Sequence, residues 1–297
     1  MDVADSRVGD HRKAVRGIRP APITDVDLPA VADFLRTVHN GRIPWSDALT
    51  QAPWSVDSPN HGFMLRDGER VVGTLLALYS QRQIAGRTEW FCNLTSWCVL
   101  PEYRARSMSL LNAVLAQEGY HFTVLSPDVG PREILSWLKF RVLDTSAALV
   151  PNLPWPTLPG GTRISADPDV IERTLTGVEL ALYHDHARAL AASHLVLSNG
   201  KESCYVMFRK DRYKGAQVLA VVLHVSNPSL FQRSLKVLTR HLLIHHGAIA
   251  TMAELRITGC KPLLSIAVNR RPKMYCSTGL QAGQIDYLYS ELVCVPS

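Results

Sequence analysis

The densest group of titratable side chains in this sequence is the run Tyr183-His184-Asp185-His186, and His194 follows it. Histidine titrates near neutral pH and is a natural general base, while a neighbouring carboxylate can orient its ring. His184 and His186 are two positions apart, so on a helix their side chains point to different faces and are poor joint ligands for a metal. The run therefore favours proton transfer over a metal site, and histidines that cap a helix or lie on the surface are the alternative.

A second stretch is suited to binding an anion through its backbone. The apolar run Trp90–Leu100 ends at Pro101, the polar segment Glu102–Ser109 follows, and apolar residues at helical spacing occupy Leu110–Leu115 before a second apolar run at Phe122–Leu125. This pattern predicts a strand, a turn, a helix and a strand. The start of a helix presents unpaired N–H groups and the positive end of the helix dipole, so the turn is a candidate phosphate site.

The turn also carries a family motif. The segment Val99-Leu-Pro-Glu-Tyr-Arg-Ala-Arg-Ser-Met-Ser109 resembles the acyl-CoA pyrophosphate loop of the GNAT acyltransferase superfamily, which usually reads Val-x-Pro-x-Tyr-Arg/Gln-x-x-Gly-x-Gly/Ala before a Leu-rich helix. Arg104, Ser107 and Ser109 fall where the Arg/Gln and the two small residues belong. Serine replaces both glycines, and it is small and can hydrogen-bond phosphate. An ordinary strand–helix–strand unit without a ligand is the alternative.

The resemblance implies which residues would hold the donor. In the superfamily, a backbone N–H of the strand before the loop stabilises the oxyanion, which here corresponds to Cys98–Leu100, and the loop amides hold the pyrophosphate. The residues expected to bind acyl-CoA are Trp97, Cys98, Val99, Arg104, Ala105, Arg106, Ser107, Met108 and Ser109. Because the family transfers the acyl group directly, we interpret Cys98 as a small apolar strand residue and not as a nucleophile.

The proton transfers of the reaction are less clearly marked. Superfamily members commonly end this region with Tyr-x-x-x-Gly-Phe, in which the tyrosine protonates the departing thiolate. Aligning Phe140 with the last residue of that pattern puts Leu135 or Ser136 near the tyrosine position, and neither can serve as the acid. For the base that neutralises the acceptor amine, we expect His186, His184 and Asp185 to act from the second half of the chain.

The first half of the chain supplies the elements that would position this loop. Asp25 or Asp27 is expected to cap a helix whose apolar positions Leu28, Val31, Leu35 and Val38 recur at helical spacing, and a short helix follows over Asp47–Gln51. Apolar runs predict strands at residues 18–20, 61–65, 71–78 and 90–100. Asp67-Gly68 is a hairpin turn, because glycine tolerates positive φ. The resemblance implies that the fourth strand splays from the fifth and that the pantetheine of CoA lies in the gap.

The second half repeats this order faintly. We expect a helix over Asp167–Leu182 with a second helical piece to Leu195. Strands are expected at residues 203–208 and 217–225, a further helix at residues 230–243 and a closing strand at residues 285–294. Val225-Ser-Asn-Pro228 before its helix corresponds to Val99-Leu-Pro101 before the first one, which indicates a tandem repeat. Bulky side chains in Pro228–Ser234 would block a phosphate, so the second lobe is expected not to bind CoA.

These elements predict an α+β (α/β) fold in which a mixed, mostly antiparallel sheet is flanked by helices and duplicated in two lobes. Residues 1–16 are polar and are expected to form a disordered tail. Residues 17–150 are expected to form a GNAT-like acyl-CoA-binding domain, and residues 162–297 a degenerate second one. The segment Pro151–Gly161 holds four prolines and two glycines and predicts a semi-rigid linker.

Composition limits the remaining function classes. The 297 residues are 46% hydrophobic and 20% charged, which is enough for two ordinary cores. A net charge of +6 suits an anionic ligand such as CoA, but plain solubility is the simpler explanation, and no basic block indicates nucleic acid. The six cysteines form no CxxC pair, which disfavours a zinc or redox site. With no signal peptide and no membrane-spanning stretch expected, we predict a cytoplasmic protein.

The sequence therefore predicts an N-acyltransferase that moves an acyl group from acyl-CoA, with acetyl-CoA as the expected donor, to the amine of a small acceptor. A degenerate second lobe would shape the acceptor site. A transferase for a longer acyl chain is one alternative. A non-catalytic GNAT-like protein that binds acyl-CoA or regulates a partner is another, and the missing glycines and tyrosine favour it. No metal, nucleic acid or membrane is expected, and the oligomeric state is left open.

Overall fold

The structure is a computed structural model that describes residues 17–39, 43–50, 52–127, 129–156, 161–262 and 264–296. The chain forms two compact units. The first contains the segment that ends at Ala52, Val56–Val124 and Tyr275–Gly279, and the second contains Pro53–Ser55, Leu125–Met274 and Leu280–Ser297. The predicted disordered tail at residues 1–16 and the end of the predicted linker, residues 157–160, lie outside the described residues.

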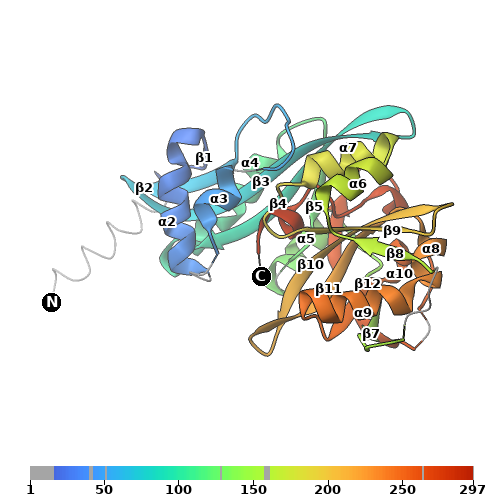
Figure 1. Cartoon of the computed structure of the whole chain (residues 1–297). Coiled ribbons are helices and arrows are strands. Elements are labelled where there is room, and N and C mark those ends of the chain that lie inside the picture. The colour runs from blue at the N-terminus through green and yellow to red at the C-terminus, as the bar shows by residue number, and fades with distance from the viewer. Residues whose placement is uncertain are drawn as a thin grey trace, which may run out of the picture. The chain divides into compact units, whose positions relative to one another are not determined.

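The first sheet has seven strands in the order β1-β2-β3-β4-β5-β14-β6. Its strands are β1 (Ala21–Pro22), β2 (Gly62–Asp67), β3 (Arg70–Ile84), β4 (Arg87–Val99), β5 (Tyr120–Val124), β14 (Lys273–Cys276) and β6 (Arg141–Leu143). Strands β1 to β4 pair antiparallel, whereas β5 lies parallel to β4. Figure 1 shows β3 and β4 as the long pair of this sheet.

Two tight turns fix the register of the first three hairpin strands. The β2–β3 turn contains Gly68 at φ +59°, as the sequence predicts. At the β3–β4 turn, Ala85 and Gly86 both have positive φ, which is the backbone that a right-handed two-residue hairpin requires. At the start of β2, Gly62 has φ +106°, and a Cβ there would lie 2.2 Å from the Leu75 carbonyl oxygen. Only glycine fits at that position.

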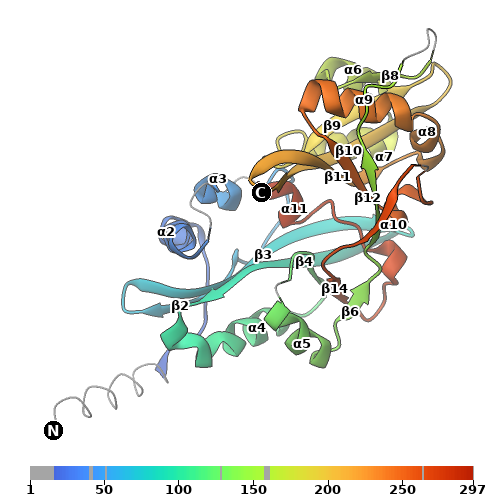
Figure 2. The same cartoon turned by 90° about the horizontal axis from the view of Figure 1, so that it is seen from below.

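Helices cover both faces of this sheet. They are η1 (Asp25–Asp27), α2 (Leu28–Val38), α3 (Trp45–Thr50), η2 (Pro101–Arg106) and α4 (Ser107–Leu115). In Figure 2, α2 and α3 lie on one side of β2 and β3, and α4 lies on the other. The predicted apolar faces point inward, because Leu28, Val31 and Leu35 of α2 are buried, as are Leu110 and Leu111 of α4.

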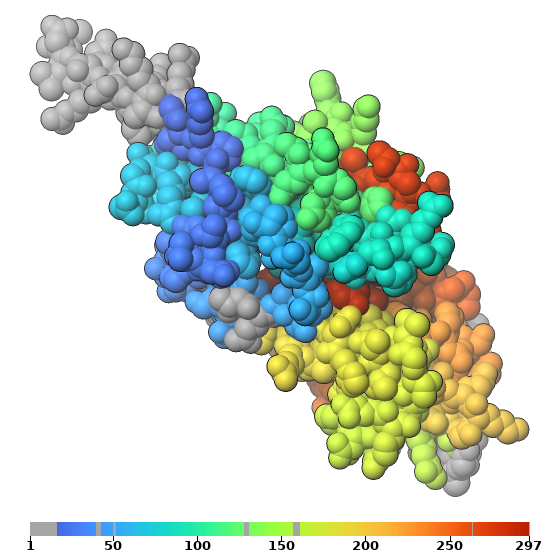
Figure 3. Space-filling view, turned by 90° about the horizontal axis from the view of Figure 1, so that it is seen from above, coloured from blue at the N-terminus to red at the C-terminus, as the bar shows by residue number. Residues whose placement is uncertain are grey.

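The second sheet also has seven strands, in the order β13-β7-β12-β11-β10-β9-β8. They are β13 (Ile266–Asn269), β7 (Ser146–Pro151), β12 (Ala250–Glu254), β11 (Ala216–Val225), β10 (Ser203–Tyr213), β9 (Ser193–Ser198) and β8 (Arg163–Ser165). The helices of the second unit are α5 (Val129–Trp137), α6 (Pro168–Thr174), α7 (Gly177–His186), α8 (Pro228–Arg233), α9 (Leu235–His246), α10 (Leu255–Thr258), η3 (Ala282–Gln284) and α11 (Glu291–Cys294). In Figure 3, α6 and α7 form the yellow surface of the second unit that faces the viewer.

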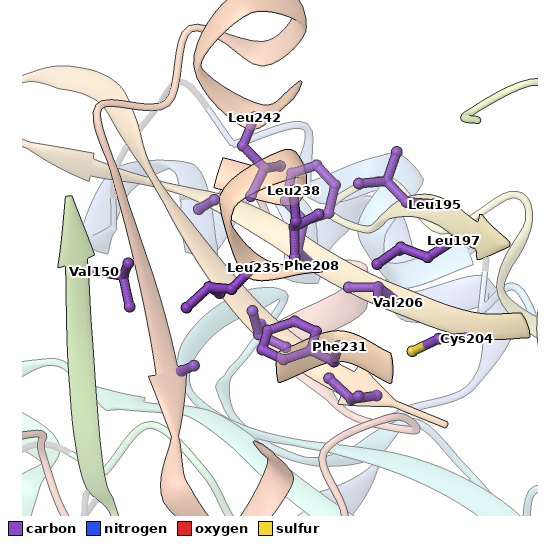
Figure 4. Close-up of a cluster of buried hydrophobic side chains, with 14 of the residues drawn as sticks. Val150, Leu195, Leu197, Cys204, Val206, Phe208, Phe231, Leu235, Leu238 and Leu242 are labelled. Atoms are coloured by element: carbon purple, nitrogen blue, oxygen red, sulfur yellow. The ribbon is translucent and has the colours of Figure 1, made fainter. Parts of the chain in front are cut away.

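The core of the second unit lies between this sheet and the α8–α9 pair (Figure 4). Phe231 of α8 and Leu238 of α9 are fully buried and point toward the strands. The sheet contributes a row of inward residues, namely Leu195, Leu197, Cys204, Val206, Phe208, Ala220 and Val222. Burial of each large apolar side chain contributes about 2 kcal/mol, so this layer accounts for much of the stability of the unit.

The two sheets have equivalent strand orders, which agrees with the predicted repeat. Each has an antiparallel hairpin (β3–β4 or β10–β11) followed by a parallel neighbour (β5 or β12). The strand beside that neighbour comes from the other half of the sequence, β14 in the first sheet and β7 in the second. The predicted α+β fold with mixed, mostly antiparallel sheets is confirmed. The predicted domains 17–150 and 162–297 stay a prediction, and the compact units differ from them at residues 53–55, 125–150 and 275–279.

Three predicted elements of the second half are wrong. The helix expected over Asp167–Leu182 is two helices, because Leu175 is extended and Gly177 has φ +56°. The helical piece expected to reach Leu195 contains the start of β9, which forms a hairpin with β10 around Gly200 at φ +83°. The closing strand expected over 285–294 pairs with no strand among the described residues, and its last four residues form α11.

Candidate functional site

The end of β4 departs from regular pairing. Leu76 of β3 lies opposite Thr95 and Thr74 lies opposite Cys98, so two residues of β4 stand where β3 has one. This is a β-bulge, and Ser96 within it has φ +50°. The Thr74 hydroxyl donates to the Ser96 carbonyl oxygen at 3.2 Å and holds the bulge from the side of β3. A bulge bends the strand and redirects the side chains that follow it, here Cys98.

Beyond Asn93, β4 also parts from its parallel neighbour. The β4–β5 pairing joins Trp90–Asn93 to Tyr120–Thr123, whereas β4 itself continues to Val99. The N–H of Leu100 donates to the Val72 carbonyl oxygen at 2.9 Å, and peptide groups alternate in direction along a strand. The N–H of Val99 therefore points away from β3, toward the side of β4 that β5 leaves unpaired after Asn93. A backbone N–H in that place can stabilise a developing oxyanion.

The segment after β4 is more regular than an open phosphate loop. Pro101–Arg106 form the 3-10 helix η2, which runs directly into α4. The N–H of Tyr103 donates to the Leu100 carbonyl at 2.9 Å, and that of Ser107 donates to the Arg104 carbonyl. A 3-10 helix pairs its amides internally, so the predicted cradle of unpaired amides differs from this structure. The groups that this segment offers to an anion are its arginine side chains and the positive end of α4.

The nine residues predicted to bind acyl-CoA fall on two elements. Trp97, Cys98 and Val99 are half-buried at the end of β4, and the Trp97 indole N–H is buried without a hydrogen-bond partner in the structure. Arg104 and Ala105 are exposed, whereas Arg106, Ser107, Met108 and Ser109 are half-buried. The Ser109 hydroxyl donates to the Arg106 carbonyl at 2.6 Å, which is a bond within the helix start.

Tyr103 of the same motif has a structural contact that anchors η2. Its side chain is 4% exposed, and its hydroxyl donates to a carboxylate oxygen of Asp67 at 2.6 Å. The hydrogen bond to Asp67 and burial raise the pKa of Tyr103, so the phenol stays protonated. Because Asp67 belongs to the β2–β3 hairpin, this bond fixes the position of the arginine-bearing segment on the sheet.

One pair at this site was not predicted. The Cys98 Sγ lies 2.8 Å from the Nε2 of His39, the residue that follows the last residue of α2. The imidazole of His39 also packs against the indole of Trp45, with ring centroids 5.4 Å apart. His39 is 59 positions from Cys98 in the sequence, and no spacing rule joins a helix-end histidine to a strand cysteine. The sequence carries no signal that could have paired them.

Comparison with known proteins shows which fold this is. No family model and no curated protein matches the sequence. A protein from Enterococcus faecalis described as a probable N-acyltransferase superimposes with a TM-score of 0.56 at 14% identity, covering 90% of this chain and 74% of that one. A GCN5-related N-acetyltransferase from Anabaena variabilis gives a TM-score of 0.54 at 12% identity over 87% of this chain and 72% of that one. The chain has a GNAT fold.

A larger acyltransferase has the same fold over most of its length. Saccharomyces cerevisiae N-myristoyltransferase with bound myristoyl-CoA superimposes with a TM-score of 0.50 at 11% identity, covering 92% of this chain and 87% of that one. At such identities the likeness establishes the fold alone. Within the GNAT fold, the parting of β4 from β5 is the feature that the sequence analysis expected for the donor site, and the β4–β5 register agrees with it.

The three predicted catalytic residues of the second half of the chain differ in exposure and in the groups that they contact. His186 is fully buried, and its Nδ1 and Nε2 lie 2.8 and 2.6 Å from the carbonyl oxygens of Leu182 and Leu288. Asp185 accepts a hydrogen bond from the Tyr289 hydroxyl at 2.6 Å. His184 is exposed and lies 3.5 Å from Glu172. These contacts tie the end of α7 to neighbouring segments of its own unit.

A buried group of histidines and tyrosines lies beside them in the second unit. The Tyr205 hydroxyl is 2.7 Å from the His194 Nδ1, and the rings of Tyr183 and His224 lie within about 6 Å of Tyr205. Burial is the main cause that lowers the pKa of His194 and of His224 to about 4 in each case. Both imidazoles are therefore neutral at pH 7. His224 lies in a strand-like apolar run and was not among the predicted site residues.

The described residues contain no candidate metal site and no candidate membrane-spanning helix. Nowhere in them do three or more His, Cys, Asp or Glu side chains come together in a way that could hold a metal ion. No helix in the described part of the chain is both long enough and apolar enough to cross a membrane.

Proposed function

We propose that this protein is an acyl-CoA-dependent N-acyltransferase whose donor site lies in the first unit. The observation that supports this most directly is the end of β4, where the strand bulges at Ser96, separates from β5 after Asn93 and leads into the arginine-bearing segment Pro101–Arg106. This combination occurs in a GNAT fold, where the strand gap is the expected place for pantetheine.

The residues present fit a diphosphate and a thioester. The exposed guanidinium of Arg104 and the half-buried one of Arg106 supply positive charge, and the N-terminus of α4 adds its dipole. In the strand gap, the N–H of Val99 would donate a hydrogen bond to the thioester carbonyl oxygen as it becomes negative. These groups act by charge and position, which is most of what a direct acyl transfer requires of the protein.

The start of the equivalent helix in the second unit has a different character. The Asn227 side chain accepts a hydrogen bond from the Leu230 N–H at 3.0 Å and caps α8, and Phe231 is fully buried in the core. Neither the amide nor the space is available to a phosphate. We therefore propose one donor site in the chain, in line with the expected degeneracy of the second lobe.

Acetyl-CoA as the donor and a small amine as the acceptor are the finer parts of this proposal. The likeness to N-myristoyltransferase, which was solved with myristoyl-CoA bound, supports a longer acyl chain as the alternative donor. The predicted roles of His186, His184 and Asp185 toward the acceptor stay a prediction, and only His184 is exposed enough to meet a solute directly.

A second candidate function is that of a non-catalytic acyl-CoA-binding protein. It is favoured by the position where the superfamily places its acidic tyrosine. Leu135 is 1% exposed there, and the Ser136 hydroxyl donates to the Arg132 carbonyl at 3.0 Å within α5. Release of free CoA thiol in the presence of an amine panel distinguishes an enzyme from a binder.

A charge placed at the start of α4 tests the donor site. We expect Ser107→Glu to lower the affinity for CoA at least tenfold in calorimetric titration, because a carboxylate would oppose the phosphates. Asn112→Glu puts the same charge on an exposed position farther along α4 and should leave the affinity within about twofold. Equal affinities of the two variants would refute the proposed site. Titration with acetyl-CoA and myristoyl-CoA then ranks the donors.

A further inference from the structure

Among the six cysteines, Cys98 has surroundings that differ from those of the buried thiols. Cys92, Cys204 and Cys294 are buried, and burial raises the pKa of Cys204 to about 11 and that of Cys294 to about 12. A buried protonated thiol is a poor nucleophile. Cys98 is only partly buried, and an imidazole nitrogen of His39 lies 2.8 Å from its sulfur. A thiol paired with an imidazole can exist as a thiolate–imidazolium ion pair, which is the reactive form.

The backbone around Cys98 suits attack on a carbonyl group. Cys98 lies two residues after Ser96, whose positive φ bends β4, and directly before Val99, whose N–H points to the edge that β5 does not pair. A nucleophile and an N–H donor from adjacent residues would meet the same carbonyl, the sulfur at its carbon and the N–H at its oxygen. His39 stands at the end of α2, so the base comes from a separate element packed on the same sheet.

We propose that Cys98 is a nucleophile that carries the acyl group as a thioester, with His39 as its proton acceptor and donor. The proposal rests on the function proposed above for the source of the acyl group. It replaces direct transfer by two successive thioester and amide exchanges in the same strand gap. It also gives a role to two side chains that the GNAT-like motif does not assign.

In the first exchange, the Cys98 thiolate attacks the thioester carbonyl carbon of acyl-CoA. The bond between that carbon and the CoA sulfur breaks, and the departing thiolate takes the proton held by the His39 imidazolium. In the second exchange, the acceptor amine attacks the acyl-Cys98 carbonyl while His39 removes its proton. The carbon–Sγ bond breaks and regenerates the thiolate–imidazolium pair, so atoms, protons and electrons balance without another reactant.

The Cys98–His39 pair can replace the tyrosine acid that this chain lacks. The superfamily pattern assigns protonation of the leaving thiolate to a tyrosine, and Leu135 and Ser136 occupy that region here. The His39 imidazolium supplies the proton instead, because it faces the sulfur chemistry from the end of α2. The absence of the tyrosine is then expected and does not indicate an inactive protein.

The test traps the acyl-enzyme without an acceptor. The wild-type protein is incubated with acetyl-CoA, and in parallel with the acetyl thioester of N-acetylcysteamine, which lacks the phosphates, and intact-mass and peptide mass spectrometry follow the modification. We expect one acetyl group on Cys98 from both donors. Cys98→Ala should abolish that adduct, and His39→Asn should slow its formation by about 100-fold. Cys276→Ser, at a cysteine of similar partial burial, and Cys260→Ser, at an exposed one, are the matched controls and should label as the wild type does.

A second measurement does not depend on acyl donors. Alkylation by iodoacetamide at pH 6.5 should modify Cys98 at least tenfold faster than Cys276, and His39→Asn should remove that difference. Equal rates for the two cysteines in the folded wild-type protein would overturn the proposed pair.

The outcomes separate this inference from the proposed function. If Cys98→Ala binds acetyl-CoA and acetylates an amine at the wild-type rate, the covalent step is refuted and direct transfer stands. If no acyl-CoA binds or reacts but the N-acetylcysteamine thioester still acetylates Cys98, the donor proposal fails and the nucleophile remains. Loss of amine acetylation in Cys98→Ala and in His39→Asn, with CoA affinity within about twofold of wild type, supports both proposals.

Discussion

The buried histidines of the second unit predict a steep loss of stability in mild acid. His194 packs between Tyr183 and Tyr205, and His224 packs against Tyr205. The Nε2 atoms of both rings are buried and have no hydrogen-bond partner among the described residues. Burial is the main cause that lowers the pKa of each ring to about 4, and the neighbouring His186 acts in the same direction in both cases.

The sign and size of the effect follow from proton linkage. A histidine in the unfolded chain has a pKa near 6.5. Between pH 6.5 and about 4, the unfolded state therefore binds protons that the folded state does not, so stability is full above pH 6.5 and falls as the pH decreases. At pH 5.5 each histidine costs about 1.4 kcal/mol, and the pair about 3 kcal/mol, relative to pH 7.5. Such a loss is a large part of the stability of an ordinary domain.

Urea unfolding at pH 7.5 and 5.5, followed by tryptophan fluorescence, measures this loss. The double variant His194→Gln, His224→Gln cannot titrate at either position, so its stability should differ between the two pH values by about 3 kcal/mol less than that of the wild-type protein. Because each protein is compared with itself at the two pH values, any pH-independent cost of the substitutions cancels. If both proteins lose the same free energy of unfolding, the two rings titrate normally in the folded state and the reasoning is wrong.

Two further predictions concern the packing of the first unit. Tyr103→Phe removes the hydroxyl that donates to Asp67 at 2.6 Å and should lower the free energy of unfolding by about 2 kcal/mol, measured by urea titration, with weaker CoA binding because the segment with Arg104 is released. An unchanged midpoint would contradict the anchoring role. Gly62→Ala should prevent folding, with a cost above about 3 kcal/mol by circular dichroism, because its Cβ would lie 2.2 Å from a backbone oxygen of β3, whereas Gly68→Ala, with open space around it, should cost about 1 kcal/mol.

Local patterns were sufficient to predict much of the first unit. The helical spacing of Leu28, Val31 and Leu35 located α2, and the apolar run Trp90–Leu100 located most of β4. The Asp67-Gly68 turn gave the β2–β3 hairpin with its register. In each case the signal and the structure that it specifies lie within a few residues of each other, so periodicity and turn chemistry determine the result.

The errors lie where a distant partner decides the structure. Residues 285–294 alternate between apolar and polar types as a strand does. Their backbone is instead contacted by side chains, and the Leu288 carbonyl oxygen, for example, lies at hydrogen-bond distance from the His186 ring. Strand β14 begins at Lys273, a residue type that indicates a surface loop. Lys273 is only 5% exposed, and its ammonium donates to a carboxylate oxygen of Glu254 at 2.7 Å, so an ion pair permits the burial. No reading of residues 270–276 by themselves supplies that partner.

The candidate site was predicted in its place on the chain but not in its chemistry. The sequence located the end of β4 and the segment with Arg104, because the motif is continuous there. It also led to the interpretation of Cys98 as an apolar strand residue, since the bulge at Ser96 and the approach of His39 both depend on how β4 meets β3 and α2. Register shifts and contacts over 59 residues are properties of packing, which a motif cannot encode.

Comparison of the two repeats indicates that only one of the two helix starts, that of α4, binds an anionic ligand. The two sheets have equivalent strand orders, and in each a strand leads into a helix start, where the helix dipole favours an anion. In the second, Asn227 caps α8, and Phe231 fills the space with a side chain whose removal from the core would cost about 4 kcal/mol. In the described part of the first, the start of α4 has no side-chain cap, and it is preceded by the half-buried Arg106, with the exposed Arg104 two residues earlier. A cap and a core residue stabilise the fold, whereas an uncapped start beside positive charge is a cost that ligand binding can offset, so function is expected where the repeat gives up stability.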